Sequence, residues 1–305
     1  MPALRALRAA APMTRALAED ARGSSVREPL TLASEPRVGA LLLALGVVDD
    51  TIRFDRLGLE ALFADTPSAL PIEPFRGVDR VVSWFGSRDE RFASKLRALA
   101  PDVTVAPSVP SVPVHGLVWA HLLGTVTTGA SAEHPERAPI AVPERLVAEG
   151  RQVLTKIGWD GGRPLVMIHP GASGPAKQWS AEGFARVITA LGARTRIVLH
   201  EGPLDGDAVR AVHSRVEASV HRLDNPALPV LAGALTHVDL FLGTDSGISH
   251  LAAAVGARCV VLFTSSAKLR WQSWAPGVET QVVTPRETAD PDVRRVMQRI
   301  RRFLG

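Results

Sequence analysis

The stretch Phe241–His250 (FLGTDSGISH) joins an apolar run directly to small residues that continue as far as Val255. An apolar run that stops abruptly before small, helix-forming residues predicts a buried strand followed almost at once by a helix. The turn between them leaves the backbone N–H groups of Ser246 and Gly247 unpaired at the N-terminus of the helix, where the helix dipole favours an anion. The stretch therefore predicts a phosphate-binding turn.

Two further polar residues lie on the same turn. Asp245 would repel a phosphate unless its carboxylate points at a sugar hydroxyl or caps the helix. His250 follows Ser246 by one helical turn and lies on the same face, so a structural role and a phosphate-side role are both open. The letters TDSG are also similar to the serine-protease pattern GDSG. Those proteases are all-β, however, and this chain has no G-x-S-x-G elbow.

Strands and helices alternate on both sides of this turn. In the second half the predicted strands are 164–170, 196–200, 238–242, 259–263 and 280–283, and the predicted helices are 143–157, 180–191, 205–216, 226–235, 249–255 and 291–303. In the first half the predicted strands are 30–33, 51–54, 78–85 and 103–105, and the predicted helices are 2–10, 36–45, 89–99 and 115–126. Apolar strands that alternate with helices predict parallel sheets covered on both faces.

The segment 127–143 has the composition of a linker, because small polar residues and prolines cannot build a core. It separates an N-terminal domain, 1–140, from a C-terminal domain, 141–288, and a last helix in 289–305 is expected to pack back toward the N-terminal domain. The predicted fold is α/β, with two doubly wound, Rossmann-like domains facing a cleft. Within the predicted helix 36–45, the side chains expected on the buried side are Val38, Leu41, Leu42 and Leu45.

The loop 169–179 (HPGASGPAKQW) directly follows a predicted strand. Glycines, a serine and a lysine in one loop can wrap a diphosphate with backbone amides, a hydroxyl and a point charge. The loop lacks the G-K-[ST] of a Walker A motif. An ordinary loop whose Lys177 lies in solvent explains the same residues, and their spacing alone favours neither interpretation. Trp179 is expected to pack in the protein and not to stack on a base.

The next predicted strand runs into Asp205 and Asp207, which form a D-x-D pattern. Two carboxylates at this spacing hold a metal ion in some transferases, but acidic residues are also favoured at the start of a helix. The helix-start explanation is the stronger one, so no metal site is predicted here. Asp205 remains a candidate acceptor for a ribose hydroxyl.

Composition limits the classes of protein to which the chain can belong. Its 305 residues are 46% hydrophobic and 22% charged, which is typical of a soluble globular protein. No run approaches the ~20 apolar residues of a membrane span, and the arginine-bearing N-terminus does not resemble a signal peptide. A single cysteine, Cys259, lies in an apolar run and has no partner for a disulfide in the chain. A cytoplasmic protein with a buried structural thiol is therefore predicted.

The net charge is only +4, but arginines at 294, 295, 299, 301 and 302 follow a helical spacing. An exposed face of the last helix is the favoured explanation, so no nucleic-acid partner is expected. An anionic acceptor at a membrane surface is a third explanation of the same arginines.

Three segments together resemble one protein family: 169–188 (HPGASGPAKQWSAEGFARVI), 198–205 (VLHEGPLD) and 239–256 (DLFLGTDSGISHLAAAVG). Their order and spacing are similar to those of glycosyltransferase family 9, the bacterial ADP-heptose:lipopolysaccharide heptosyltransferases and their relatives. The resemblance is specific across 160–265 and looser in the N-terminal half, through 30–55. It implies a two-domain GT-B fold, with the nucleotide on the C-terminal domain, the acceptor on the N-terminal domain, and an inverting displacement without a cofactor or an obligatory metal.

The resemblance also implies roles for particular residues. Lys177 and Ser173 would hold the donor phosphates, the amides of Ser246 and Gly247 would bind phosphate, and Asp205 would contact the ribose. The expected donor-binding set is Gly171, Ser173, Lys177, Asp205, Thr244, Asp245, Ser246, Gly247 and His250, of which Lys177, Asp245 and His250 are the candidate catalytic residues. Amides and a lysine at this place would stabilise the negative charge that the leaving diphosphate gains in the transition state.

One departure from the family concerns the start of the chain. Relatives begin with a strand that ends in Gly-Asp, followed by a helix resembling TPALRALR, whereas this sequence begins MPALRALR. The first strand of the N-terminal domain, and the aspartate expected to act as general base, are therefore absent from the sequence. The explanations, in order of preference, are an upstream start, an inactive relative, or another carboxylate as base. Ser265 and Ser266 also replace a glycine-containing turn.

The expected function is transfer of a sugar, most simply heptose from ADP-heptose, to a lipopolysaccharide or other cell-envelope glycan. The alternative is a catalytically inactive nucleotide-sugar-binding relative, and a third possibility is a nucleotide-sugar epimerase. The expected partners are a nucleotide sugar and a lipid-linked or envelope glycan acceptor. The expected location is cytoplasmic. Peripheral contact with the cytoplasmic face of the inner membrane is a further possibility that fits this location.

Overall fold

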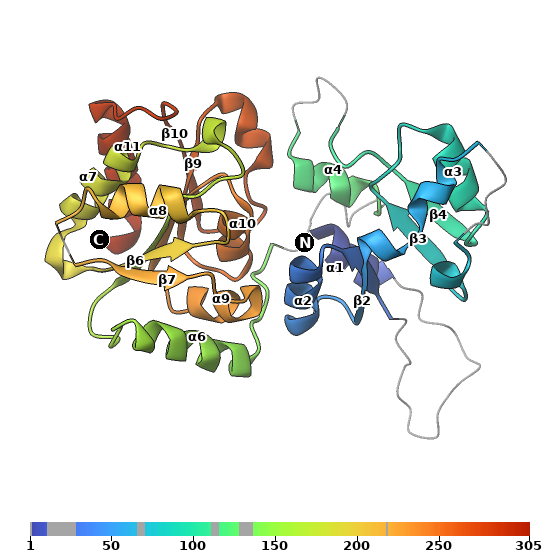
Figure 1. Ribbon diagram of the computed structural model, residues 1–305, viewed down its shortest axis with the longest axis horizontal. Helices are drawn as coiled ribbons and strands as arrows, with labels where there is room; N and C mark the ends of the chain where they lie inside the picture. Colours follow the sequence, from blue (N-terminus) through green and yellow to red (C-terminus); the bar gives the residue numbers. More distant parts are fainter. Residues whose placement is uncertain (1, 11–28, 66–70, 111–115, 128–136, 218) are drawn as a thin grey trace. The chain divides into compact units, whose positions relative to one another are not determined.

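The computed structural model describes residues 2–10, 29–65, 71–110, 116–127, 137–217 and 219–305 (Figure 1). The chain divides into two units, Met1–Glu136 and Arg137–Gly305. The first residues of the second unit are held to the rest of it by hydrogen bonds. Arg137 Nε donates to the carbonyl of Trp274 (2.7 Å), and the N–H of Ile140 donates to the carbonyl of Ala254 (2.8 Å). Most of the predicted linker, at 128–136, lies outside the described residues, as does the first residue of the helix predicted at 115–126.

The second unit is built on a parallel sheet of six strands in the order β10-β9-β8-β5-β6-β7. This is the strand order of a doubly wound fold, with the order reversing between β5 and β8. β5, β8 and β9 are buried along their whole length, as their continuous apolar sequences predict. The strands are β5 (Leu165–His169), β6 (Arg196–Glu201), β7 (His221–Asp224), β8 (Leu240–Thr244), β9 (Cys259–Phe263) and β10 (Val278–Val282).

In the described part of this unit, α-helices cover the sheet, and four of them connect consecutive strands (Figure 1). Ser180 caps α7 as the sequence predicts, because its Oγ accepts a hydrogen bond from the N–H of Gly183 (2.9 Å). Trp179 is 4% exposed and packs edge-on against Phe184, which confirms its predicted packing role. The helices are α6 (Glu144–Lys156), α7 (Ala181–Leu191), α8 (Gly206–His213), α9 (Leu228–Leu235), α10 (Gly247–Ala254) and α11 (Asp290–Leu304).

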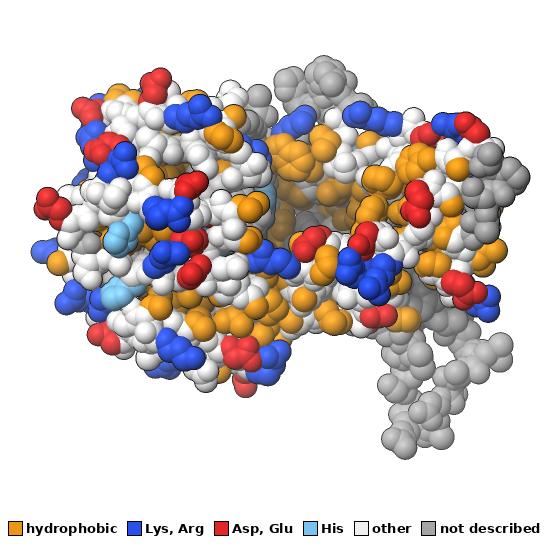
Figure 2. All heavy atoms as spheres, viewed as in Figure 1, with side chains coloured by type: hydrophobic (Ala, Val, Ile, Leu, Met, Phe, Trp, Pro, Cys, Tyr) orange, Lys and Arg blue, Asp and Glu red, His pale blue; other side chains and the backbone are white. Residues whose placement is uncertain are grey.

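The helix expected in a separate segment, 289–305, is an integral part of the second unit. The apolar side chains of α11 belong to the same core cluster as those of the sheet and of α7. The helix is amphipathic, and several arginines on its polar face are paired: Arg299 and Arg302 with Glu279 of β10, and Arg295 with Asp292. On the face drawn in Figure 2, basic and acidic side chains are interspersed over this unit.

Cys259 is fully buried at the start of β9, and burial raises the pKa of its thiol well above the usual value. The thiol therefore stays protonated and unreactive at neutral pH, as expected for a structural cysteine.

The described part of the first unit holds two separate parallel pairs of strands, where the sequence predicted one doubly wound sheet without its first strand. One pair is β1 (Thr31–Ser34) with β2 (Asp50–Arg53), and the other is β3 (Arg80–Ser83) with β4 (Asp102–Val105). The helices of this unit are α1 (Pro2–Ala10), α2 (Pro36–Ala44), α3 (Glu90–Arg97) and α4 (Val118–Gly124), and short 3₁₀ turns lie at Phe54–Arg56, Leu59–Leu62 and Glu73–Phe75.

One helix of this unit buries less than the sequence predicts. α2 contacts the narrow β1–β2 pair, and Leu41, Leu42 and Leu45 are buried as expected. Val38 is 41% exposed, so its predicted burial is wrong. A sheet of two strands covers a narrower stripe of a helix than a full sheet does, and Val38 lies outside that stripe.

Candidate functional site

The two polar segments singled out in the sequence begin side by side at one edge of the sheet. β5 and β8 are neighbours, with His169 opposite Gly243. The loop that follows β5 and the turn that follows β8 therefore leave the sheet together. This is the point at which the strand order reverses, where ligands bind in doubly wound folds.

The turn after β8 has the geometry that the sequence predicts. β8 ends at Thr244, and α10 begins at Gly247. Ser246 is the N-cap residue, and its Oγ accepts a hydrogen bond from the N–H of Ser249 (3.3 Å). The earlier N–H groups of the first turn have no partner within the helix. Nothing lies within 4 Å of the position of a side chain at Gly247, so the space in front of this residue is open.

Lys177 is brought to this turn. It ends the 3₁₀ turn Pro175–Lys177, and its Nζ lies 2.8 Å from Oδ2 of Asp245. The contact is an ion pair between the ammonium and the carboxylate, and Oδ2 of Asp245 accepts no hydrogen bond. The carboxylate of Asp245 is 6% exposed and the lysine 34% exposed, so the cation is the more accessible partner. The ammonium of Lys177 and the N–H groups at the start of α10 therefore lie on the same side of the turn.

His250 stands beside the same carboxylate, with Nε2 4.0 Å from Oδ1 of Asp245. The side chain of His250 is 44% exposed, and its partial burial lowers its pKa below the usual value; Asp245 opposes the shift, and the ammonium of Lys177 adds to it. The imidazole is therefore neutral at pH 7, and it can donate or accept a hydrogen bond at the turn without adding charge.

Two threonine hydroxyls hold the loop that carries Lys177. Thr244 Oγ1 donates to the carbonyl of Gly171, and Thr264 Oγ1 donates to the carbonyl of Ala176 (2.7 Å). Thr244 is fully buried, so its side chain supports the loop from beneath. Thr264 was not singled out in the sequence, although it follows the apolar strand β9 just as Asp245 follows β8.

Asp205 packs against the same loop. Its Oδ2 accepts a hydrogen bond from the N–H of Gly202 (3.1 Å), and a side chain at Gly171 would collide with its carboxylate. The absence of a side chain at Gly171 therefore lets the loop close over Asp205. Asp207 instead pairs with Arg210 at the surface, so the two carboxylates of the D-x-D pattern have different partners. Ser173 lies exposed on the loop.

A pair of buried histidines beneath the loop was not foreseen. His169 is the last residue of β5, and His200 lies near the end of β6. Both side chains are buried, and their Nδ1 atoms are 3.1 Å apart. Nε2 of His169 lies 3.9 Å from Oδ2 of Asp205. Burial lowers the pKa of His169, against the opposing effects of Asp205 and of the carbonyl of His200. A neutral ring there lets one Nδ1 donate to the other.

The profile of glycosyltransferase family 9 (heptosyltransferase) matches residues 121–299, more than half of the chain. The chain belongs to glycosyltransferase family 9. The matched residues include the loop, the turn and the two threonines described above. Lipopolysaccharide heptosyltransferase 3 of Escherichia coli is 33% identical to this family 9 chain over 124 residues. That match spans 37% of the chain and 35% of the relative, about a third of each.

Solved structures share the fold of the whole family 9 chain. A glycosyl transferase family 9 structure from Veillonella parvula covers 99% of this chain and 92% of its own, with a TM-score of 0.74 at 17% identity. The structure of E. coli heptosyltransferase WaaC with ADP-2-deoxy-2-fluoro heptose covers 99% of this chain and 94% of its own, with a TM-score of 0.61 at 14% identity. The fold is therefore the GT-B fold that the sequence predicts. Among the helices in the described ranges, none has the length and apolar run that a bilayer crossing requires.

Proposed function

We propose that this protein is an inverting glycosyltransferase that moves a heptose from a nucleoside-diphosphate donor, ADP-heptose, to a lipopolysaccharide or other cell-envelope glycan. Membership of family 9 supports the reaction class. The segment similar to lipopolysaccharide heptosyltransferase 3 supports the acceptor class, and the WaaC structure with an ADP-heptose analogue supports the donor.

The single observation that carries the proposal is the approach of Lys177 to the N-terminal turn of α10. In the reaction, the bond between the anomeric carbon and the diphosphate oxygen breaks, and its electron pair stays on the diphosphate. The acceptor hydroxyl attacks the opposite face of the sugar and gives its proton to a carboxylate that acts as general base or to water. The ammonium and the amides of Ser246 and Gly247 stabilise the departing diphosphate more than the intact donor, which lowers the barrier.

The remaining residues have supporting roles in this proposal. Asp245 holds the ammonium at the turn and faces a hydroxyl of the sugar, and the neutral ring of His250 hydrogen-bonds on the phosphate side. Asp205, beneath Gly171, is the acceptor for a ribose hydroxyl. Thr244 and Thr264 fix the two ends of the loop, so that Lys177 and Ser173 are placed before the donor arrives.

The test is a transfer assay with the purified chain, ADP-heptose and a heptose-free lipopolysaccharide core. ADP release that depends on the core, together with a heptosylated product of inverted configuration, is the expected result. Donor binding by calorimetry without any transfer would support the inactive, nucleotide-sugar-binding alternative. A changed sugar nucleotide in the absence of the core would support the epimerase.

A further inference from the structure

A short row of buried polar side chains runs from the sheet of the second unit to the loop after β5. His200 of β6 lies against His169 of β5, with their Nδ1 atoms 3.1 Å apart, and Nε2 of His169 lies 3.9 Å from Oδ2 of Asp205. Both histidines are 2% exposed, and the side chain of Asp205 is 15% exposed. The proposed reaction uses Asp205 but neither histidine. Burying polar groups costs free energy, so this pair beside a proposed ligand contact requires an explanation.

Asp205 is enclosed by two close backbone segments. Its Oδ2 accepts a hydrogen bond from the N–H of Gly202 (3.1 Å), and a side chain at Gly171 or at Gly202 would collide with the carboxylate. Leu204, the preceding residue, is 94% exposed, so the turn itself lies at the surface of the protein. The carboxylate is therefore held within an exposed turn, and only a small part of it is open to a ligand.

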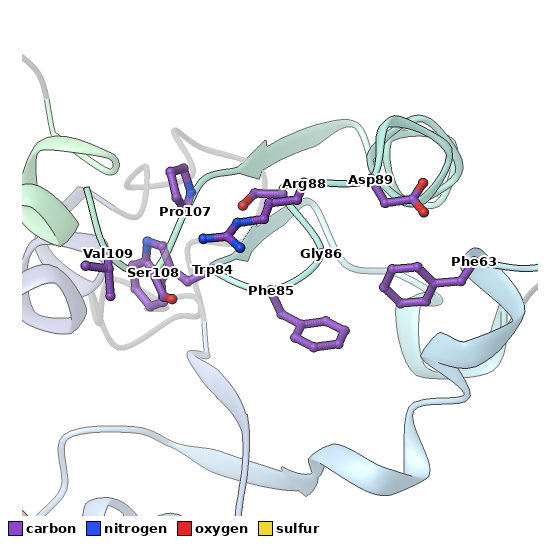
Figure 3. Close-up of a pocket in the computed structure, with 10 residues that line it drawn as sticks. Phe63, Trp84, Phe85, Gly86, Arg88, Asp89, Pro107, Ser108 and Val109 are labelled. Carbon is purple, nitrogen blue, oxygen red and sulfur yellow. The ribbon is translucent and has the colours of Figure 1, made fainter. Parts of the chain in front are cut away.

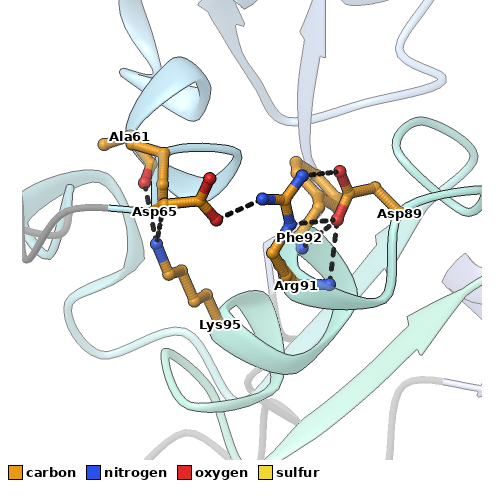
Figure 4. A network of polar contacts seen from close by, with 7 residues as sticks. Ala61, Asp65, Asp89, Arg91, Phe92 and Lys95 are labelled. Atoms are coloured by element: carbon orange, nitrogen blue, oxygen red, sulfur yellow. Dashed lines mark hydrogen bonds and ion pairs between the residues drawn. The ribbon is translucent and has the colours of Figure 1, made fainter.

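Within the described residues, no lysine or arginine pairs with Asp205. Carboxylates in comparable positions do have a cation. Glu201, at the end of β6, pairs with Arg222 (2.7 Å from Oε2 to Nε). Asp89, which caps α3 in the first unit, pairs with Arg91 (Figure 4). An ionised carboxylate has about four acceptor sites, so one backbone N–H and a nearby imidazole leave Asp205 with acceptor capacity for a ligand.

The contacts of the two histidines determine which nitrogen of His169 carries the proton. Two neutral rings whose Nδ1 atoms are 3.1 Å apart share one proton between those atoms. If that proton were on His169, the lone pair of its Nε2 would face the carboxylate of Asp205, and the two would repel. If it is on His200, His169 carries its own proton on Nε2, facing the carboxylate. Nδ1 of His169 then faces the carbonyl of His200 at 3.4 Å, but a carbonyl dipole repels a lone pair less than a full charge does. The second arrangement is therefore the stable one.

We propose that His169 is a positioning residue of the donor site, held by His200 and directed at Asp205. Its Nε2–H orients the carboxylate, so that the remaining oxygen lone pairs face the ribose hydroxyls of the nucleotide. At 3.9 Å the N–H acts on the carboxylate as a dipole, and the contact shortens to a hydrogen bond when the donor binds. A carboxylate that is oriented in advance loses less conformational entropy on binding.

The assignment rests on the proposed function, in which Asp205 is the acceptor for a ribose hydroxyl. It adds that recognition of the nucleotide depends on a buried histidine that touches neither the sugar nor the phosphates.

The first experiment measures the preference for ribose by calorimetry on the full chain. The probes are ADP, 2′-deoxy-ADP, 3′-deoxy-ADP and inorganic pyrophosphate, which has no ribose. The variants are His169→Gln and His169→Asn. A glutamine amide extends as far as Nε2 of a histidine, whereas an asparagine amide extends only as far as Nδ1. The glutamine therefore keeps a donor toward Asp205, and the asparagine keeps only the contact with His200.

Two histidines elsewhere serve as controls. Nε2 of His237 lies 3.0 Å from the carbonyl of Val147, and this residue precedes β8, whereas the proposed phosphate-binding turn follows it. Nε2 of His121 on α4 lies 2.8 Å from the carbonyl of Pro107, which lines a pocket of the first unit (Figure 3). His237→Asn and His121→Asn each remove a hydrogen bond from a histidine to a carbonyl without changing the surroundings of Asp205. Urea midpoints and far-UV circular dichroism report whether each variant is folded.

In the wild type, at least one of the two deoxynucleotides should bind about tenfold more weakly than ADP, the scale of a lost hydrogen bond to a charged group. His169→Asn should lower that ratio to about threefold or less, because only ADP loses a contact. His169→Gln should preserve most of the ratio, and both control variants should preserve all of it. Pyrophosphate should bind equally well to all the proteins. A histidine that only stabilised the fold would not change the ratio.

Nuclear magnetic resonance of the wild type gives a second readout that does not depend on a folded variant. In protein labelled with nitrogen-15 at histidine, long-range correlations distinguish a ring protonated on Nε2 from one protonated on Nδ1. The signals of His169 are assigned from through-space contacts with the ring of His200. His169 should carry its proton on Nε2 at neutral pH, and ADP should shift the Nε2 resonance more than pyrophosphate does.

An unchanged ADP preference in His169→Asn, or a wild-type His169 protonated on Nδ1, overturns the proposal. Equal loss of the preference in His169→Gln and His169→Asn also overturns it, because the ring would then act by packing alone. Equal binding of ADP and both deoxynucleotides by the wild type would show that no ribose hydroxyl is recognised, with the same consequence. Failure of the proposed function would look different: ADP and pyrophosphate would bind without any dependence on Lys177, whatever His169 does.

Discussion

Lys177 supplies the positive charge of the α10 turn, and removing it gives the most direct test of the site. In Lys177→Ala we expect the affinity for ADP to fall by about 1.5–3 kcal/mol, the scale of a lost hydrogen bond to a charged group. Calorimetry measures the loss. Lys156→Ala is the control, because Lys156 is an exposed lysine of the same unit on α6, outside the loop. Unchanged ADP affinity in Lys177→Ala would refute its role.

Asp245 is placed to act on two partners, and its substitution separates them. The carboxylate pairs with Lys177, so Asp245→Asn frees the ammonium and removes a negative charge beside the diphosphate. A nucleotide sugar would lose a hydroxyl contact as well. We therefore expect ADP-heptose affinity to fall relative to ADP affinity, as measured by paired titrations. An equal loss for both ligands would show that the carboxylate only positions the lysine.

His169 makes the folding stability depend on pH. Burial lowers its pKa in the folded state, whereas the unfolded chain has the ordinary value of about 6.5. The unfolded state therefore takes up more protons as pH falls, so stability is full above about pH 6.5 and declines below it. Urea midpoints at pH 7.5 and pH 5.5 measure the decline. His169→Asn should make this decrease in the urea midpoint smaller, and His213→Gln, at an exposed histidine, should leave it unchanged. The same decrease in the wild type and in both variants would contradict the assignment.

At the scale of elements, the loop after β5 functions only if it is held in place. Thr264→Val removes the bond to the carbonyl of Ala176, next to Lys177, and we expect ADP to bind about fivefold more weakly, the equivalent of about 1 kcal/mol. Thr236→Val is a matched control, because Thr236 makes a bond of the same length to a carbonyl at the end of α9, away from the loop.

Thr264→Val and Thr236→Val should lower the free energy of unfolding in urea by similar amounts. Only Thr264→Val should bind ADP more weakly. If Thr264→Val kept its ADP affinity, the bond would stabilise the fold without positioning the lysine.

Local sequence predicted most of the second unit, and the reason is visible in its strands. β5, β8 and β9 are apolar throughout and lie between clear helix patterns, so their place in a parallel sheet follows from composition. β7 was missed because its four residues, HRLD, include only one buried side chain, Leu223, at the sheet edge. The place of α11 in the core of the second unit was not predicted, because an amphipathic helix shows which of its faces is buried but not which neighbour covers that face.

The local geometry of the candidate site was predicted where its residues are close in sequence. The turn from Thr244 to Gly247 could be inferred from ten residues, because strand, cap and helix are all encoded there. The hydroxyl bond from Thr264 to the loop joins residues far apart in sequence, and the contact between His169 and His200 depends on strand pairing. No local spacing indicates such contacts.

At the scale of the whole molecule, the two units differ in how completely they are built. The second has a continuous six-stranded sheet with its own core, whereas the described part of the first has two separate pairs of strands. We therefore expect residues 137–305, expressed alone, to unfold cooperatively in urea and to bind ADP within about threefold of the full chain, a difference of less than 1 kcal/mol.

Lys177→Ala in the isolated unit should weaken ADP binding by the same factor as in the full chain. A fragment without a cooperative transition would show that the second unit depends on the first. Transfer should be absent from the fragment, because the acceptor is proposed to bind to the first unit.

The inaccessible thiol of Cys259 makes this protein convenient for spectroscopy. It is the chain's one cysteine, and its reactivity is suppressed by its place inside β9. Maleimide reagents should therefore leave the native protein unlabelled, and a cysteine introduced at an exposed position of each unit could carry a donor or acceptor dye without first removing the natural one. Energy transfer between the dyes would then report, molecule by molecule, whether nucleotide changes the distance between the units.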